Sequence, residues 1–286
     1  MRGVMDAVLR PVLCLVLSVG LLVASVHRVL PPLAPETSVA PPGTRAMWLW
    51  EREPPETVVA WATAHSVSTI FAYYDPRADV TELTRLRALC DDAGITLDAL
   101  GGEPAWTTDH AAALAWARAA AATGLFRGLH VDVEPYLLPA WQQEQAVLVP
   151  QLLRLLDELA RIGPPLELDV PFWLPTVQVG GENLADAVLA RVDGVTVMSY
   201  RNTATGGNSM LGVADDLLRR AGKAAKPARL GAETQALGDC AYCTFHGGTG
   251  SAMRATLSDV DRAAQRYAAF EGIAVHQYVT WMALTG

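Results

Sequence analysis

The amino-acid sequence predicts a (β/α)8 barrel, an α/β fold of eight parallel strands and intervening helices, with the eighth helix missing. From residue 46 onward, short runs of β-branched and aromatic residues alternate with Ala- and Leu-rich stretches of helical period. Eight such runs are present, and the chain ends shortly after the last one. Parallel strands need crossovers, and eight repeats in about 240 residues match a typical barrel. An open doubly wound sheet is the alternative, although the first strand-to-helix turn has no Gly-rich phosphate loop.

The strands are expected where apolar runs lie between turn residues. Their predicted bounds are Ala46–Trp50, Ser68–Tyr74, Thr96–Leu100, Gly128–Glu134, Leu166–Phe172, Gly194–Tyr200, Arg229–Thr234 and Ile273–Trp281. Pro54 and Pro55 open the first helix, because proline suits a first helical turn. Ser258, with Asp261 three residues later, predicts the start of the last helix as a capping box, and Gly272 its end.

The N-terminal segment is expected to lie outside the barrel domain, which takes residues 46–286. Arg2 and Arg10 precede an apolar run, a pattern typical of a secretory signal peptide or signal anchor over residues 1–28. The run is slightly shorter than the roughly 17–25 residues that a membrane-spanning helix needs. Residues 29–45 form a Pro-rich linker. We therefore expect a secreted or cell-surface protein that touches a membrane only through this segment.

Composition narrows the class of function. Of the 286 residues, 51% are hydrophobic and 18% are charged, which suits a large packed core. The formal net charge is −8 and no long basic run follows the N-terminus, so no nucleic-acid partner is expected. The sequence has no P-loop, dinucleotide or Gly-x-Ser-x-Gly motif. We expect a monomer without a cofactor.

The cysteines suggest an oxidising compartment. Cys240 and Cys243 form an isolated C-x-x-C pair in a Gly-rich stretch, and in an exported protein we expect a local disulfide between them. Half of a zinc site that includes His246 is the alternative. Cys90 lies in an apolar helical pattern and is expected to be a buried thiol.

Carboxylates at the end of the fourth predicted strand are the strongest candidates for catalysis. His130, Asp132 and Glu134 alternate along the strand, so they share a face that should point into the barrel near its active-site end. Two close carboxylates in a partly dry site raise one pKa, which provides a proton donor beside an ionised partner. A structural hydrogen-bond network is one alternative, and a metal site built from these three residues is another. We assign no metal ligands.

Further polar and aromatic residues lie at the other predicted strand ends, where barrel active sites form. Flat aromatic faces suit the CH-rich faces of sugars, although tryptophan is also ordinary core material. The residues expected to bind substrate are Trp50, Asp169, Trp173, Tyr200, Arg201, Gln235 and Trp281.

The residues of the fourth strand carry a resemblance to a known family. The stretch Gly-Leu-His-Val-Asp-Val-Glu that ends at Glu134 resembles the motif D-x-x-D-x-D-x-E of chitinase-like (family 18) glycoside hydrolases. Its last two acids are matched, whereas Arg127 and His130 stand at the earlier acidic positions. The resemblance implies Glu134 as general acid and Asp132 as its partner.

Two more matches follow in chain order. Met198-Ser199-Tyr200 resembles the sixth-strand M-x-Y of that family, and Trp281 resembles its strand-eight tryptophan. The resemblance implies that Tyr200 contacts the reacting group and that Trp281 supports the central sugar. It also implies that the substrate's own acetamido group is the nucleophile.

A second resemblance names a different nucleophile. Glu134-Pro135 and Glu233, on the fourth and seventh predicted strands, resemble the acid and nucleophile of the large retaining-glycosidase clan. The usual fourth-strand motif there is Asn-Glu-Pro, and Val133 stands in place of Asn. A retaining enzyme needs its two carboxylates about 5–5.5 Å apart. A salt-bridging role at a strand end is the alternative for Glu233.

Taken together, the sequence predicts an extracytoplasmic glycosidase-like hydrolase that cleaves O-glycosyl bonds of a polysaccharide or oligosaccharide by general acid/base catalysis. Its expected catalytic residues are Glu134, Asp132 and Glu233. A non-catalytic carbohydrate-binding barrel at the cell surface is the alternative function. A structural partner of another envelope protein is a third possibility.

Overall fold

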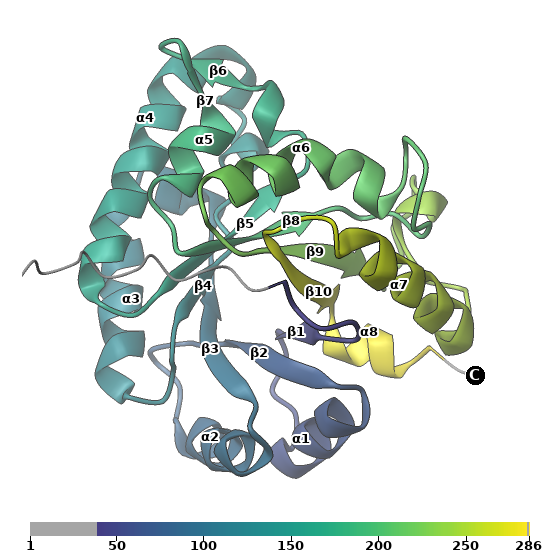
Figure 1. The fold of residues 1–286 in the computed structure, drawn as a ribbon. Coiled ribbons are helices and arrows are strands. Elements are labelled where there is room, and N and C mark those ends of the chain that lie inside the picture. Colours follow the sequence, from purple (N-terminus) through teal and green to yellow (C-terminus); the bar gives the residue numbers. More distant parts are fainter. Residues whose placement is uncertain (1–38, 285) are drawn as a thin grey trace, which may run out of the picture. The chain divides into compact units, whose positions relative to one another are not determined.

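Eight parallel strands close into a barrel in the computed structural model, which describes residues 39–284 and 286 (Figure 1). The ring order is β1-β10-β9-β8-β5-β4-β3-β2, and β2 pairs with β1 to complete it. The barrel strands are β1 Arg45–Leu49, β2 Val67–Tyr73, β3 Thr96–Gly101, β4 Leu129–Val131, β5 Leu166–Pro171, β8 Gly194–Met198, β9 Ala228–Glu233 and β10 Phe270–His276. The predicted (β/α)8 barrel is confirmed. The predicted signal segment, residues 1–28, lies outside the described residues.

Helices between the strands form the outer layer of the barrel (Figure 1). They are α1 Pro55–Ala64, α2 Thr81–Ala93, α3 His110–Thr123, α4 Trp141–Leu159, α5 Leu184–Leu189, α6 Met210–Lys223 and α7 Gly250–Ala264. A small antiparallel pair, β6 Gln178–Val179 and β7 Glu182–Asn183, precedes α5. Within the described part of the chain, we find no helix with the length and hydropathy that a membrane span requires.

The last strand is shorter than predicted, and a short helix follows it. We expected a strand over Ile273–Trp281 and no eighth helix. Instead β10 ends at His276 and helix α8 occupies Tyr278–Met282. The side chain of Gln277 accepts a hydrogen bond from the backbone N–H of Val279 at 3.2 Å, so it caps this helix. Capping therefore overrides the β propensity of the aromatic and β-branched residues in this segment.

The predicted start of the last long helix is also wrong. Helix α7 begins at Gly250, where the side chain of Thr249 accepts from the N–H of Ala252. Asp261 lies inside the helix and bonds Arg45 at the start of β1, with distances of 3.0 and 2.8 Å between paired atoms. It also accepts from the N–H of Gly43 at 3.0 Å. This ion pair joins the first strand to the last long helix and holds the end of the predicted linker against the barrel.

Two distinct cores fill the structure. A large apolar layer lies between the strands and the helices, and it includes Leu129 and Val131 from β4. The second lies inside the barrel on one side, where Ala46, Trp48, Phe71, Leu100 and Ala274 pack together. The opposite interior side is formed by β4, β5 and β9, and it holds buried charged residues. The barrel interior is therefore apolar on one side and ionic on the other.

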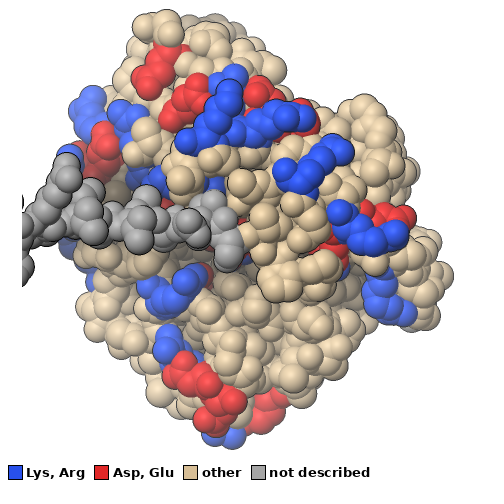
Figure 2. All heavy atoms as spheres, viewed as in Figure 1, with Lys and Arg blue, Asp and Glu red and all other residues tan. Residues whose placement is uncertain are grey.

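The outer surface of the barrel carries interspersed charges. On the face shown in Figure 2, most of the surface is uncharged, and acidic and basic side chains lie next to one another in several places. On α6, Arg219 pairs with Asp215 and Arg220 pairs with Asp216, each one helical turn apart. Exposed pairs of this kind contribute little to stability.

Breaking the buried ion pair that joins β1 to α7 should destabilise the fold. The side chains of Arg45 and Asp261 are 10% and 3% exposed, so Asp261→Ala leaves a guanidinium without its partner in a dry site. We expect the free energy of unfolding to fall by about 3–5 kcal/mol, measured by urea denaturation. Asp259→Ala removes an exposed partner of Arg262 on the same helix and should change it by less than about 1 kcal/mol. Equal effects from both variants would contradict this prediction.

Candidate active site

A buried ion network occupies the ionic side of the barrel interior. His130 on β4 bonds Asp169 on β5 through Nε2 at 3.0 Å, and its ring stacks on Phe71 at 3.6 Å. Burial alone would lower the pKa of His130, but the charge and hydrogen bond of Asp169 raise it overall. The imidazolium form of His130 is therefore favoured, although its side chain is fully buried. His130 thus acts as a counterion in the interior.

Below this pair lies a second one. Arg229 on β9 bonds Glu167 on β5, and Thr196 on β8 donates to the same carboxylate at 2.6 Å. Burial would raise the pKa of Glu167, yet the charges of Arg229 and His130 bring it down to about 2. Glu167 is therefore ionised at any physiological pH. Each carboxylate of this network, Asp169 and Glu167, therefore has a positively charged partner in the barrel interior.

Asp169 has both carboxylate oxygens engaged. Its Oδ1 bonds His130, and its Oδ2 accepts from the indole N–H of Trp48 at 3.2 Å. Asp169 is 4% exposed, so it lies beneath the barrel mouth. The sequence assigned it to substrate binding, whereas these bonds give it the position of a fixed charge under the site.

Asp132 and Glu134 lie just beyond the end of β4, which is shorter than the predicted strand. The N–H of Asp132 bonds the carbonyl of Gly101 at 3.0 Å, and this bond holds the segment against the end of β3. A Cβ atom on Gly102 would lie 2.0 Å from the carbonyl oxygen of Asp132, so only glycine permits this approach. Gly101 at the end of β3 and Gly102 directly after it therefore place Asp132 at the barrel mouth.

Both carboxyl groups hold their protons more strongly than usual. Burial, then the charges of Asp169 and Glu134, raise the pKa of Asp132 well above its ordinary value. Burial and the charge of Asp169 raise the pKa of Glu134, while a hydrogen bond from Tyr136 and the proximity of His276 oppose that rise. Among the described residues, Oδ1 of Asp132 is buried without a hydrogen-bond partner. Both carboxyl groups therefore keep their protons to a higher pH than a free carboxyl group does.

Tyr136 connects Glu134 to a polar pocket. Its hydroxyl donates to Oε2 of Glu134, and its ring packs edge-on against Trp173 at 4.9 Å. Both rings line a pocket of about 670 Å3. Its remaining lining residues are mostly amides and aromatics: Trp141, Gln142, Gln145, Thr176, Val177 and Gln178. The sequence assigned Trp173 to substrate binding but not Tyr136, although Tyr136 follows Glu134 at the next-but-one position.

Glu233 belongs to a chain of hydrogen bonds that runs through His276 to Trp50. One of its oxygens accepts from the backbone N–H groups of Thr234 and Gln235, each at 2.7 Å, and the other bonds Nδ1 of His276 at 2.9 Å. The indole N–H of Trp50 donates to Nε2 of His276 at 3.0 Å. An indole nitrogen only donates, so Nε2 accepts and Nδ1 carries the proton given to Glu233. The predicted Gln235 thus contacts Glu233 through its backbone.

His276 was not predicted as a site residue. His276 is the last residue of β10, whereas the predicted strand continues to Trp281. The prediction therefore places His276 inside the strand and not at its end, the barrel mouth. His276 follows Ala274, a residue of the interior core, by two positions. This spacing places both side chains on the interior face of the strand. His276 lies between Trp48 and Tyr200, with ring-centre distances of 5.4 and 6.2 Å.

Tyr200 lies near enough to four of the predicted polar residues for their charges to act on its phenol. Its pKa is raised well above the usual value by burial and by four negative charges around the phenol. These charges belong to Asp169, Glu233, Asp132 and Glu134. A Cβ atom on Gly231 would lie 2.9 Å from the ring of Tyr200, so a glycine on β9 leaves room for the ring. Tyr200 therefore remains a neutral hydrogen-bond donor among the acids.

Two predicted substrate-binding residues have other surroundings. Arg201 lies over the rings of Phe172 and Tyr242 at 4.9 and 5.4 Å, and its Nε donates to Asn208 at 2.6 Å. Trp281, on α8, is 8% exposed and packs edge-on against Trp61 of α1 at 4.6 Å. Trp281 thus belongs to the helix layer, and the structure does not bring it to the carboxylates.

The predicted disulfide between Cys240 and Cys243 is confirmed, and it holds a loop beside the site. Asn202, next to Arg201, donates its side-chain amide to the carbonyls of Ala241 and Thr244, each at 3.1 Å. The disulfide loop is therefore pinned to the segment that follows β8. Cys90 is buried and free, as predicted. Within residues 39–284, no group of three His, Cys, Asp or Glu side chains is arranged to hold a metal ion.

Comparisons with known proteins identify the fold but no family. No protein-family model matches the sequence, and no curated protein matches it. A GH18 chitinase from Pseudoalteromonas aurantia is similar in structure, with a TM-score of 0.52 and 13% identity over 84% of this chain and 97% of that one. A candidate deoxyribose-phosphate aldolase from Toxoplasma gondii has a TM-score of 0.51 and 14% identity over 85% and 93%. The resemblance to chitinase-like glycosidases is thus confirmed at the level of the fold, which an aldolase shares equally.

Proposed function

We propose that this chain is an extracytoplasmic glycoside hydrolase that acts on a polysaccharide or oligosaccharide by general acid/base catalysis. One observation carries the proposal: Asp132 and Glu134 at the barrel mouth, together with the buried Asp169 and Glu233, lie near the phenol of Tyr200, and the pKa values of Asp132 and Glu134 are raised. Such sites form where groups of like charge are buried together. The pocket beside Tyr136 and Trp173 supports a saccharide, because amides and aromatic faces suit hydroxyl groups and sugar rings.

Glu134 acts as the proton donor in this proposal. Its raised pKa extends the pH range over which the carboxyl group is protonated, and its partial exposure leaves it accessible to a ligand at the mouth. The carboxyl proton passes to the glycosidic oxygen as the bond from that oxygen to the anomeric carbon breaks. The departing sugar leaves as an alcohol, and water finally supplies the hydroxyl on the anomeric carbon and returns a proton to Glu134.

Asp132 and Tyr200 hold the reacting group. The buried Oδ1 of Asp132 has no hydrogen-bond partner among the described residues, and we assign it to a polar group of the substrate that reaches the end of β4. The hydroxyl of Tyr200 keeps its proton because its pKa is raised, so it can donate a hydrogen bond to the substrate. Asp169 remains beneath them and sustains the raised pKa values.

Glu233 has a positioning role in this proposal. Both of its oxygens accept hydrogen bonds, from two backbone N–H groups and from His276. A carboxylate that is so engaged is a poor nucleophile, because attack would require it to give up these bonds. This favours the substrate's acetamido group, implied by the chitinase-like resemblance, as the nucleophile. Glu233 instead fixes the tautomer and the orientation of His276.

Export is part of the proposal. The disulfide between Cys240 and Cys243 is compatible with an oxidising compartment. The positively charged, apolar N-terminal segment has the sequence pattern of an export signal.

Removing the acid function of Glu134 should abolish turnover and spare binding. We expect Glu134→Gln to lower kcat by about 10²–10⁴-fold, the range attributed to general acid catalysis. Hydrolysis of a panel of glycosides by the full-length protein measures this. Glu182→Gln, which changes an exposed glutamate on β7, is the matched control and should leave kcat unchanged.

Two outcomes contradict the assignment. Equal activity of wild type and Glu134→Gln would exclude this residue as the acid. Saccharide binding without turnover by the wild-type protein would indicate the alternative, a carbohydrate-binding barrel without catalysis.

The hydrogen bond from Tyr136 should set the alkaline limit of activity. A proton donor loses activity as the pH rises through its pKa. Tyr136 lowers the pKa of Glu134, so Tyr136→Phe should raise that pKa and move the alkaline limb of the kcat profile to higher pH. Tyr242→Phe, an exposed tyrosine on the disulfide loop, is the control and should leave the profile in place. A shift of the limb to lower pH in Tyr136→Phe would disprove the role of Glu134.

A further inference from the structure

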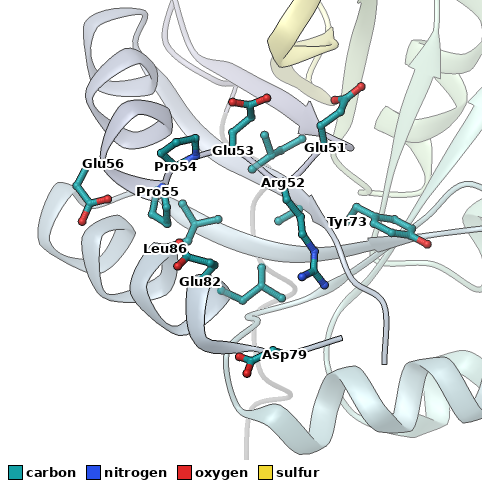
Figure 3. A pocket seen from close by; sticks show the side chains of 13 residues that line it. Glu51, Arg52, Glu53, Pro54, Pro55, Glu56, Tyr73, Asp79, Glu82 and Leu86 are labelled. Carbon is teal, nitrogen blue, oxygen red and sulfur yellow. The ribbon is translucent and has the colours of Figure 1, made fainter. Parts of the chain in front are cut away.

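A separate pocket lies at the barrel mouth between the segments that follow β1 and β2 (Figure 3). Its volume is about 470 Å3, within the range of small-ligand sites. Its floor is apolar and is formed by Leu49, Ala72, Leu83 and Leu86. Leu49 and Ala72 are buried at the ends of their strands, so the floor continues the packed core.

The rim of this pocket has an excess of negative charge. Its acidic residues are Glu51, Glu53, Glu56, Asp79 and Glu82, and its basic residue is Arg52. Arg85, outside the pocket, neutralises Glu56 at 2.7 Å. Glu51 and Glu53 lie on one side of the pocket, and Glu82 and Asp79 lie on the other (Figure 3). A ligand in this space is therefore exposed to carboxylates from two directions.

An aromatic wall joins the pocket to the carboxylate site. Tyr73 lines the pocket and is 44% exposed, and its ring lies 6.0 Å from that of Trp50. Trp50 donates to His276, which bonds Glu233. A saccharide at the barrel mouth can therefore extend over Trp50 and Tyr73 into the pocket.

We propose that this pocket binds a sugar unit that carries a protonated amine, so that the substrate is a saccharide with glucosamine-type units. This inference rests on the proposed function and specifies its substrate class. The rim carboxylates attract an ammonium group, while Tyr73 and the apolar floor accept the CH-rich face of the ring. A neutral sugar gains only the second interaction. The net charge of −8 favours the approach of the same cationic ligand.

The test compares two probes of equal length by isothermal titration calorimetry with the full-length protein. The probes are a tetramer of β-1,4-linked glucosamine and its fully N-acetylated form, at about pH 6, where the amines are protonated. We expect tighter binding of the glucosamine tetramer, and a preference that diminishes with added salt. Two rim charges are removed in Glu53→Gln/Glu82→Gln, which should weaken binding of the glucosamine tetramer by about fivefold. The acetylated tetramer should be unaffected.

Two further variants sharpen the comparison. Arg52→Gln removes the basic residue of the rim and should strengthen binding of the glucosamine tetramer, a change in the opposite direction. Asp92→Asn alters an exposed acid on α2 that does not line the pocket, and it should have no effect. The single variants Glu53→Gln and Glu82→Gln replace the double variant if it folds poorly.

The outcomes separate this inference from the proposed hydrolase. An unchanged preference in the rim variants overturns the inference, even if acetylated saccharides are hydrolysed. A tetralysine peptide that binds with the same sensitivity to the rim variants, when the glucosamine tetramer does not bind, overturns it in favour of a peptide site. A rim-dependent preference for the glucosamine tetramer without turnover of any glycoside supports the pocket and contradicts the hydrolase.

Discussion

The fixed negative charge of Asp169 is the feature on which the candidate site depends. His130 and Trp48 hold its two oxygens beneath the barrel mouth. That charge raises the pKa of four neighbours: Asp132, Glu134, Tyr136 and Tyr200. Because one charge shifts the pKa of several groups, the protonation of the carboxyl groups at the mouth depends on the bonds that hold Asp169 below them. Acid catalysis at the proposed site therefore depends on how the interior of the barrel is packed.

The barrel interior contains charged residues that are paired with one another. Glu167 and Arg229 form a second ion pair beneath His130, while the opposite side of the barrel is closed by Trp48 and Phe71. Burying one charge without the others would be strongly destabilising. Glycines complete the arrangement, because Gly102 allows the backbone of Asp132 to approach β3. Charge pairing and close backbone contact thus act together to bring the strand ends into one site.

Much of the fold could be predicted from the sequence, because alternation along each strand is a local property. The pattern of His130 and its neighbours indicates the interior face of β4 correctly. The segment after His276 could not be assigned in this way, since a single capping bond from Gln277 converts a β-like stretch into helix. The roles of His276 and Glu233 depend on contacts between strands, which no local pattern contains. Trp281 was misplaced for the same reason: its position follows the end of β10.

The departures from the chitinase-like motif have a physical meaning in this structure. That motif has acids at the positions of Arg127 and His130, and here both are bases. Each base pairs with an acid on a neighbouring strand, Arg127 with Asp98 on β3 and His130 with Asp169 on β5. Negative charge is thus retained in the interior, but it comes from strands on either side of β4. A fold that an aldolase shares does not specify a reaction. The negative charge of Asp169 beneath Glu134 favours the proposed acid catalysis, and in this chain β5 provides that charge.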